Sequence, residues 1–116
     1  MNQNVSFKDA INHTKDIIKR FEKIEGKPWG VEGAIIELQK QVGELAKFVM
    51  VQEKYYFADR DKLDKQYETN KEKIGDELAD ILYVIIRIAN HYGIDLVVAH
   101  INARKAEDKF LKTKSV

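Results

Sequence analysis

This chain is constrained most by two long stretches in which apolar side chains recur at steps of three and four residues. The first runs from about Val31 to about Gln52, and the second follows Asn70 and ends before Gly93. Apolar residues at this spacing line one side of an α-helix. The sequence has a single proline and six glycines, so few residues interrupt a helix. It therefore predicts two long amphipathic helices.

A shorter helix is expected before this pair and another after it. The first opens at Ser6, because Ser6 and Asp9 have the spacing of a capping box. Its end is predicted at the Gly26-Lys27-Pro28 break. The last helix begins near Asp95, whose side chain can accept a hydrogen bond from the free amides at a helix start. The expected fold is all-α, with four helices in one bundle.

The connection between the two long helices is expected to be irregular. Residues 53–70 are charged and aromatic without sustained periodicity, which predicts a long loop, with one extra helical turn as an alternative. Thr69 and Glu72 have capping-box spacing, so the second long helix is expected to start there. Gly93 occupies the position at which a residue in the left-handed conformation commonly ends a helix.

The composition limits the function classes open to the chain. Its 116 residues suit one domain, 1–116, and 44% hydrophobic with 34% charged residues indicate a globular chain. The net charge of +1 gives no reason to expect binding to nucleic acid or a membrane surface. The absence of cysteine excludes disulfides, thiolate metal sites and cysteine nucleophiles. Because there is no long apolar run and no apolar signal-peptide core, the expected location is the cytoplasm.

The second long helix is apolar on nearly every side over residues 79–89, with Arg87 as the main exception. A helix of this kind is buried by more than one neighbour. In so small a chain, a second copy can supply the additional neighbour. We therefore expect a four-helix bundle completed by oligomerisation, as a homodimer or a dimer of dimers. The alternative is a self-contained four-helix bundle.

Acidic and amide side chains border the apolar stripes of both long helices. Glu37, Gln41 and Glu44 lie along one line of the first, and Glu77 and Asp80 lie beside apolar positions of the second. If the helices are antiparallel neighbours, these groups converge, and a bound cation relieves their mutual repulsion. An all-oxygen set selects a hard ion such as Mg²⁺ or Mn²⁺. The alternative is a solvated polar face.

Two motifs carry a resemblance to a known family. The segment Gln41-Val42-Gly43-Glu44-Leu45-Ala46-Lys47, followed by Asp76-Glu77-Leu78-Ala79-Asp80-Ile81-Leu82-Tyr83, resembles the signature of the MazG-like nucleotide pyrophosphohydrolases, in the all-α NTP pyrophosphatase superfamily. The likeness extends over roughly residues 28–100. It implies a single MazG-like domain that converts a nucleoside triphosphate, NTP or dNTP, to the monophosphate and pyrophosphate. It also implies Mg²⁺ as the cofactor and the house-cleaning of nucleotides as the role.

The resemblance implies roles for single residues as well. Glu44, Glu77 and Asp80 match three of the family's four acidic residues, which hold the metals and serve catalysis. Trp29 matches a tryptophan that packs against the nucleotide base, although a hydrophobic staple at the helix start is an alternative. Family members present a lysine and an asparagine to the phosphates from the last helix. The candidates here, for which solvated surface is the alternative, are Asn102, Arg104 and Lys105.

Gln41 departs from the family pattern, because it occupies the position of the first acidic residue. Its amide oxygen can contact a cation but brings no charge and cannot act as a base. Glu37, one turn earlier on the same line, is the candidate for the missing charge, and we count it among the catalytic residues. Two main hypotheses follow: an active pyrophosphohydrolase, or a catalytically degenerate member that binds nucleotide or a protein partner without turnover. A purely structural helical module is the third.

Overall fold

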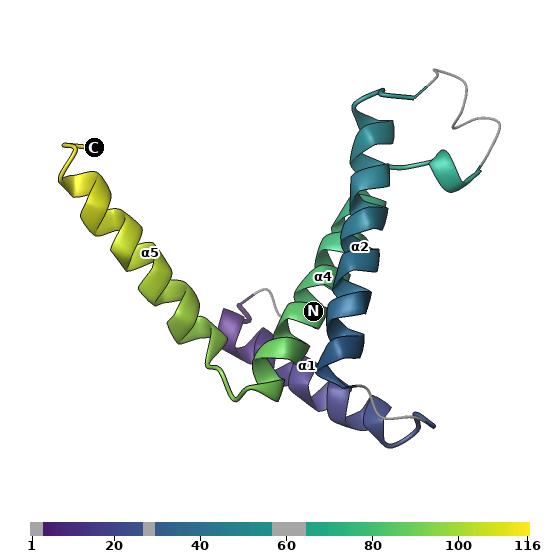
Figure 1. Cartoon of the computed structure of the whole chain (residues 1–116), viewed down its shortest axis with the longest axis horizontal. Coiled ribbons are helices and arrows are strands. Elements are labelled where there is room, and N and C mark those ends of the chain that lie inside the picture. The colour runs from purple at the N-terminus through teal and green to yellow at the C-terminus, as the bar shows by residue number, and fades with distance from the viewer. Residues whose placement is uncertain (1–3, 27–29, 57–64) are drawn as a thin grey trace. The chain divides into compact units, whose positions relative to one another are not determined.

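The structure, a computed structural model, describes residues 4–26, 30–56 and 65–116. These residues form α-helices and one 3-10 turn, and they contain no β-strand, which confirms the all-α class for this part of the chain. No single helix within these ranges is both long and apolar enough to cross a membrane. The elements, drawn in Figure 1, are α1 (Phe7–Glu22), α2 (Val31–Gln52), η1 (Lys65–Tyr67), α4 (Lys71–His91) and α5 (Leu96–Lys112).

Most helix ends lie where the sequence predicts them. The capping box of α1 is formed, because the Asp9 amide donates to Ser6 Oγ at 3.0 Å and the Ser6 amide donates to Asp9 Oδ2 at 3.4 Å. Asp95 caps α5 by accepting a hydrogen bond from the Val98 amide at 3.1 Å. The predicted bounds of α2 are also confirmed. Local capping chemistry therefore determines where these helices begin.

The start of α4 differs from the prediction by one residue. Asn70, and not Thr69, accepts the capping hydrogen bond, which the Lys73 amide donates to Asn70 Oδ1 at 2.8 Å. The prediction of a Thr69–Glu72 capping box was therefore wrong. Two adjacent residues could both act as caps here, and asparagine ranks above threonine at this position.

The end of α4 is a Schellman motif. Gly93 has φ of 64°, in the left-handed region that glycine adopts without strain, as the sequence predicts. The Gly93 amide donates to the Asn90 carbonyl at 3.2 Å, and the Ile94 amide donates to the Ala89 carbonyl at 2.9 Å. These two bonds satisfy carbonyl groups that the helix end leaves free.

The chain divides into two compact units, and α4 contributes to both. One unit contains α1, α4 from Ile86 onward, and α5. Its buried apolar side chains are Ile11, Ile18, Ile86 and Ala89. Arg87, the charged residue in the apolar run, lies 4.0 Å from Glu25 in the same unit, and only 11% of its side chain is exposed. A nearby carboxylate therefore offsets part of the cost of burying this guanidinium.

The second unit contains α2, η1 and α4 up to Ile85. Within it, α2 and the first part of α4 run in opposite directions (Figure 1), and Glu44 of α2 acts electrostatically on Glu77 of α4. The antiparallel arrangement on which the predicted convergence of acidic groups depends is therefore present. Ala34 and Val84 are buried in this unit, whereas several large apolar side chains of α4 stay more than one-third exposed. These side chains are Leu78, Leu82 and Ile85.

Candidate metal centre

The predicted polar line of α2 carries two lysines as well as the carboxylates. Glu37 is followed after three residues by Lys40, and Glu44 is followed after three residues by Lys47. At this spacing the side chains are neighbours on the helix surface. The line on α2 is therefore a row of alternating charges with the Gln41 amide in its middle.

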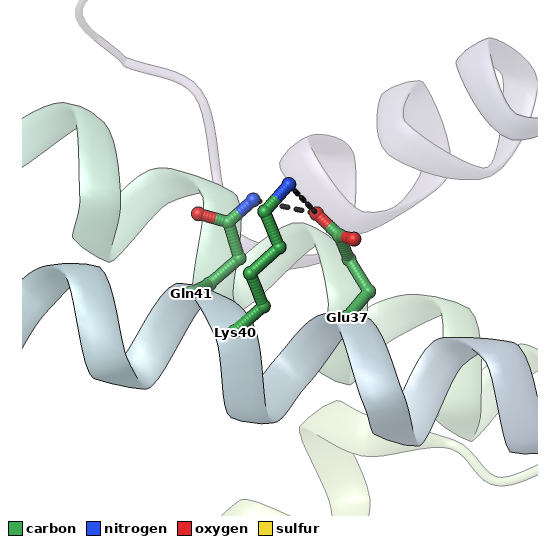
Figure 2. A network of polar contacts seen from close by, with 3 residues as sticks. All are labelled: Glu37, Lys40 and Gln41. Carbon is green, nitrogen blue, oxygen red and sulfur yellow. Dashed lines mark hydrogen bonds and ion pairs between the residues drawn. The ribbon is translucent and has the colours of Figure 1, made fainter.

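The first half of this row is a three-residue network (Figure 2). Gln41 Nε2 donates a hydrogen bond to Glu37 Oε1 at 2.7 Å, and Lys40 Nζ lies 3.9 Å from the same oxygen. The Glu37 side chain is 25% exposed, whereas that of Lys40 is 68% exposed. The Glu37 carboxylate is thus held mainly by the amide of Gln41, with a solvated ammonium group nearby.

The second half of the row is an ion pair. Lys47 Nζ lies 3.2 Å from Glu44 Oε2, and the Lys47 side chain is only 24% exposed. The same ammonium group lies 5.4 Å from the centre of the Phe48 ring. A lysine that is covered to this extent neutralises Glu44 more effectively than a freely solvated one does, since screening is weaker there.

The half-buried carboxyl of Glu77 on α4 is the most perturbed group of the site. Burial raises its pKa above the ordinary value of 4.5, and the carboxylates of Asp80 and Glu44 raise it further. Lys40 acts in the opposite direction. Glu77 Oε2 is itself buried and has no hydrogen-bond partner. The ionised form of Glu77 is therefore destabilised, and part of this destabilisation comes from Glu44 on α2.

These observations bring three of the predicted residues into one electrostatic neighbourhood: Glu44 from α2, and Glu77 and Asp80 from α4. The buried, unpartnered oxygen of Glu77 and the all-oxygen donor set fit a hard divalent cation. Within the three described ranges, however, no three His, Cys, Asp or Glu side chains form a group that could hold a metal ion. A cation at this point therefore requires side-chain rotation, foremost that of Glu44 away from Lys47.

The remaining predicted site residues are Trp29 and three side chains of α5. Trp29 falls outside the described residues. Asn102, Arg104 and Lys105 lie on α5, in the other compact unit, and all three are exposed. The guanidinium of Arg104 pairs with Glu107 on the same helix. Their contact with a phosphate stays a prediction.

A surface hollow on α5 contains none of these residues. Its volume is about 360 Å³, and it lies along this one helix, lined by Ala106, Glu107, Phe110 and Leu111. None of these four side chains provides a nucleophile or a set of metal ligands. The perturbed carboxyl of Glu77 is therefore a better guide to chemistry than the shape of this hollow.

Sequence reasoning missed the two lysines of the polar row. Lys40 and Lys47 each stand three residues after a glutamate of the predicted line, and that spacing is the signal that could have identified them. Their presence changes the charge of the site, because two ammonium groups offset two of the four carboxylates at Glu37, Glu44, Glu77 and Asp80.

No protein-family model matches this chain, and neither a curated protein nor a solved structure matches it. The resemblance to the MazG-like pyrophosphohydrolases therefore rests on the residues of the two motifs. The arrangement of α2 and α4 and the electrostatics of Glu77 are independent of that resemblance.

Proposed function

We propose that this chain is a Mg²⁺-dependent nucleoside triphosphate pyrophosphohydrolase of the MazG-like type, which converts NTP or dNTP to the monophosphate and pyrophosphate. The observation that carries the proposal is the buried Glu77 Oε2 without a hydrogen-bond partner, in a carboxyl whose pKa is raised first by burial and then by Asp80 and by Glu44 of α2. Carboxylates that repel one another across two helices, with Glu77 half-buried among them, are stabilised by a divalent cation. Mn²⁺ has the same preference for oxygen and is the expected substitute.

The proposed ligands are Glu44, Glu77 and Asp80, together with the neutral carbonyl oxygen of Gln41. When bound, the cation neutralises charge on the phosphates and polarises the attacking water. A carboxylate oxygen of this set that is left free by the cation would accept the proton of that water. Glu37 adds a negative charge one turn before Gln41 on the same row.

Residues outside the acidic set are proposed to bind the nucleotide. Trp29 is the candidate for stacking on the base, since an indole offers a large flat face. The polar side chains of α5 are the candidates for phosphate contacts, since amide and cationic donors complement phosphate oxygens. These candidates are Asn102, Arg104 and Lys105.

We further propose that the protein assembles as a homodimer or a dimer of dimers and acts in the cytoplasm in nucleotide house-cleaning. Support for assembly comes from large apolar side chains that stay exposed on both long helices of the second unit. Examples are Val42 and Val49 of α2 and Leu78 of α4, which are 47%, 42% and 53% exposed. A second copy that covers these faces removes apolar surface from water.

A second candidate function is supported by the contacts of the polar row. In a catalytically degenerate protein that binds nucleotide or a protein partner without turnover, Glu37 and Glu44 do not need to be free for a cation. Glu37 is bonded to Gln41, and Glu44 is paired with Lys47 at 3.2 Å. An enzyme must break the second of these contacts on binding the cation, whereas a binding protein keeps it.

The experiment that separates the two functions is a pyrophosphate-release assay with dNTPs and NTPs, with and without Mg²⁺. We expect Mg²⁺-dependent release that Asp80→Asn lowers by about a hundredfold or more, because a lost metal ligand removes several kcal/mol of transition-state stabilisation. The matched control is Asp76→Asn, the same change four residues earlier on α4; both aspartates are exposed, but Asp76 raises the pKa of Glu77 less than Asp80 does. Asp76→Asn should leave most of the activity.

Circular dichroism of both variants checks that the comparison is made between folded proteins. If release by the unsubstituted chain does not exceed that of Asp80→Asn, even at high protein concentration, the pyrophosphohydrolase proposal is wrong and the binding protein replaces it. If both aspartate variants lose activity equally, the assignment of Asp80 as a ligand is wrong.

A further inference from the structure

Gln41 is the residue at which this chain departs from the acidic motif that it resembles. Its side chain is half-buried, and its amide nitrogen donates to Glu37 Oε1 at 2.7 Å. The orientation of this amide follows from chemistry. An ionised carboxylate can only accept hydrogen bonds, so the nitrogen of Gln41, and not its oxygen, must face Glu37.

This contact determines the direction of the other end of the amide. Figure 2 shows the Gln41 carbonyl oxygen turned away from Glu37, toward the C-terminal side of α2. Glu44 stands three residues further in that direction on the same line of the helix. The amide therefore presents a neutral oxygen to the side of the row on which Glu44 lies.

The contacts of the Glu37 carboxylate favour its hydrogen bond to Gln41 and oppose its rotation toward a cation. Its carboxylate accepts from Gln41 and also has the Lys40 ammonium 3.9 Å away, with only 25% of its side chain exposed. A hydrogen bond to an ionised acceptor is stronger than one between neutral groups. Leaving both contacts to reach a cation would sacrifice this stabilisation.

We propose that Glu37 is a positioning residue, which fixes the Gln41 amide so that its carbonyl oxygen is the neutral donor of the cation site. This inference rests on the function proposed above and refines it. Glu37 then acts through Gln41 and neither binds the cation nor serves as the base. This role replaces the direct participation of Glu37 that the sequence predicts.

A pair of substitutions at Glu37 separates the two roles in the full-length chain. Glu37→Gln removes the charge but keeps an oxygen that accepts the hydrogen bond from Gln41, whereas Glu37→Ala removes both. Both variants also lose the charge attraction between residue 37 and Lys40, so that loss cannot account for a difference between them. The probe is Mn²⁺ alone, and its free concentration is followed by electron paramagnetic resonance.

For a positioning residue, Glu37→Gln keeps the Mn²⁺ affinity within about threefold, because a neutral hydrogen bond still orients the amide. Glu37→Ala lowers it by about tenfold or more, the usual effect of losing a group that orients a metal ligand. The proposal is overturned if Glu37→Gln weakens Mn²⁺ binding as much as Glu44→Gln does, because Glu37 is then a direct ligand. It is also overturned if Glu37→Ala binds Mn²⁺ as the unsubstituted chain does.

Two control variants on α2 define the background of this experiment. Glu32→Ala removes an exposed carboxylate from the first turn of the same helix, and Gln39→Ala removes an exposed amide. Both should keep the Mn²⁺ affinity. Gln41→Ala should weaken binding to the same extent as Glu37→Ala, since both changes remove the same donor from the site.

A second measurement needs no metal and distinguishes failure of this inference from failure of the proposed function. The side-chain NH₂ signals of Gln41 in a ¹⁵N-correlated NMR spectrum should be shifted and slow to exchange in the unsubstituted chain and in Glu37→Gln, but not in Glu37→Ala. If these signals are those of a free amide in the unsubstituted chain, the positioning role is overturned even where Mn²⁺ binds. If the amide is held but Mn²⁺ does not bind, the proposed function and the donor role of Gln41 fail together.

Discussion

The two ends of α4 differ in what their side chains experience. Toward the C-terminal end, Ile86 and Ala89 are 2% and 6% exposed, and packing alone accounts for their positions. Toward the N-terminal end, Leu78 is 53% exposed, while the neighbouring Glu77 holds a buried oxygen without a partner. One helix thus supplies apolar packing at one end and an electrostatic cost at the other.

This difference indicates where a functional site can occur in a small helical chain. A residue such as Ile86 stabilises the fold by its burial, and its position needs no further explanation. Glu77 destabilises the metal-free fold, because burial and neighbouring carboxylates oppose its charge. A group that costs stability is a candidate for a functional role, and the role proposed for Glu77 is cation binding.

The largest expected effect is the difference in stability between apolar substitutions at the two ends of α4. Ile86→Ala should lower the free energy of unfolding by about 2–5 kcal/mol, because it leaves a cavity among packed side chains. Leu78→Ala should lower it by less than about 1 kcal/mol in the monomer, since solvent already reaches this side chain. Urea denaturation at low protein concentration measures both. Equal losses would remove the distinction between the two ends.

Addition of Mg²⁺ should raise the free energy of unfolding, by less than the upper part of the range expected for Ile86→Ala. At a free concentration about a hundredfold above Kd, binding to the folded state alone raises the free energy of unfolding by about 2.7 kcal/mol. Glu77→Gln should abolish this gain, whereas Asp76→Asn should keep it. The measurement is the urea midpoint with and without Mg²⁺, with Ca²⁺ as a test of ion selectivity. A gain that survives Glu77→Gln would contradict the assigned site.

The pH dependence of stability should report Glu77 in the metal-free protein. Because its pKa is raised in the folded state, the folded protein binds this proton more tightly than the unfolded chain does. The associated stability is fully present below the ordinary carboxyl pKa of 4.5 and is lost as the pH rises through the raised value. Glu77→Gln should flatten this part of the urea-midpoint profile and leave the metal-free protein more stable at neutral pH. A decline with pH that is unchanged in Glu77→Gln would assign it to other groups.

Lys47→Gln should have the smallest effect. Its ammonium group lies 3.2 Å from Glu44 and competes with a cation for that carboxylate. A partly exposed ion pair is worth about 0.2–1 kcal/mol, so the substitution should raise the Mn²⁺ affinity by at most about fivefold. Lys40→Gln is the comparison, and it should change the affinity less, since its side chain is 68% exposed. Weaker Mn²⁺ binding in Lys47→Gln would show that Lys47 assists the site.

Much of the fold was predictable because helix ends depend on local chemistry. The capping residues Ser6 and Asp95 and the left-handed Gly93 act through their own backbone neighbourhoods, and the structure confirms all three. The predicted start of α4 was wrong by one residue, because Thr69 and Asn70 are adjacent and both can cap a helix. Periodicity therefore identified the helices, and only atomic contacts could choose between adjacent caps.

Less of the site was predictable, because side-chain pairing depends on which groups turn toward one another. The acidic line was visible as a spacing, but the bond between Gln41 and Glu37 and the pairing of Glu44 with Lys47 were not. Burial of Glu77 Oε2 depends on the packing of α4 against its neighbours, which periodicity does not resolve. Residue types therefore predicted the kind of ion, and the structure identified the contacts that the proposed ion would have to displace.

The central claim is that one cation lies between α2 and α4, and paramagnetic broadening by Mn²⁺ tests it most directly. Substoichiometric Mn²⁺ added to the ¹⁵N-labelled chain should broaden the backbone amide signals around Glu44 and around Glu77 and Asp80 together. Excess Mg²⁺ should restore both sets, because the two ions compete for the same oxygen ligands. Broadening confined to one helix, or spread over exposed carboxylates along the whole chain, would contradict a shared site.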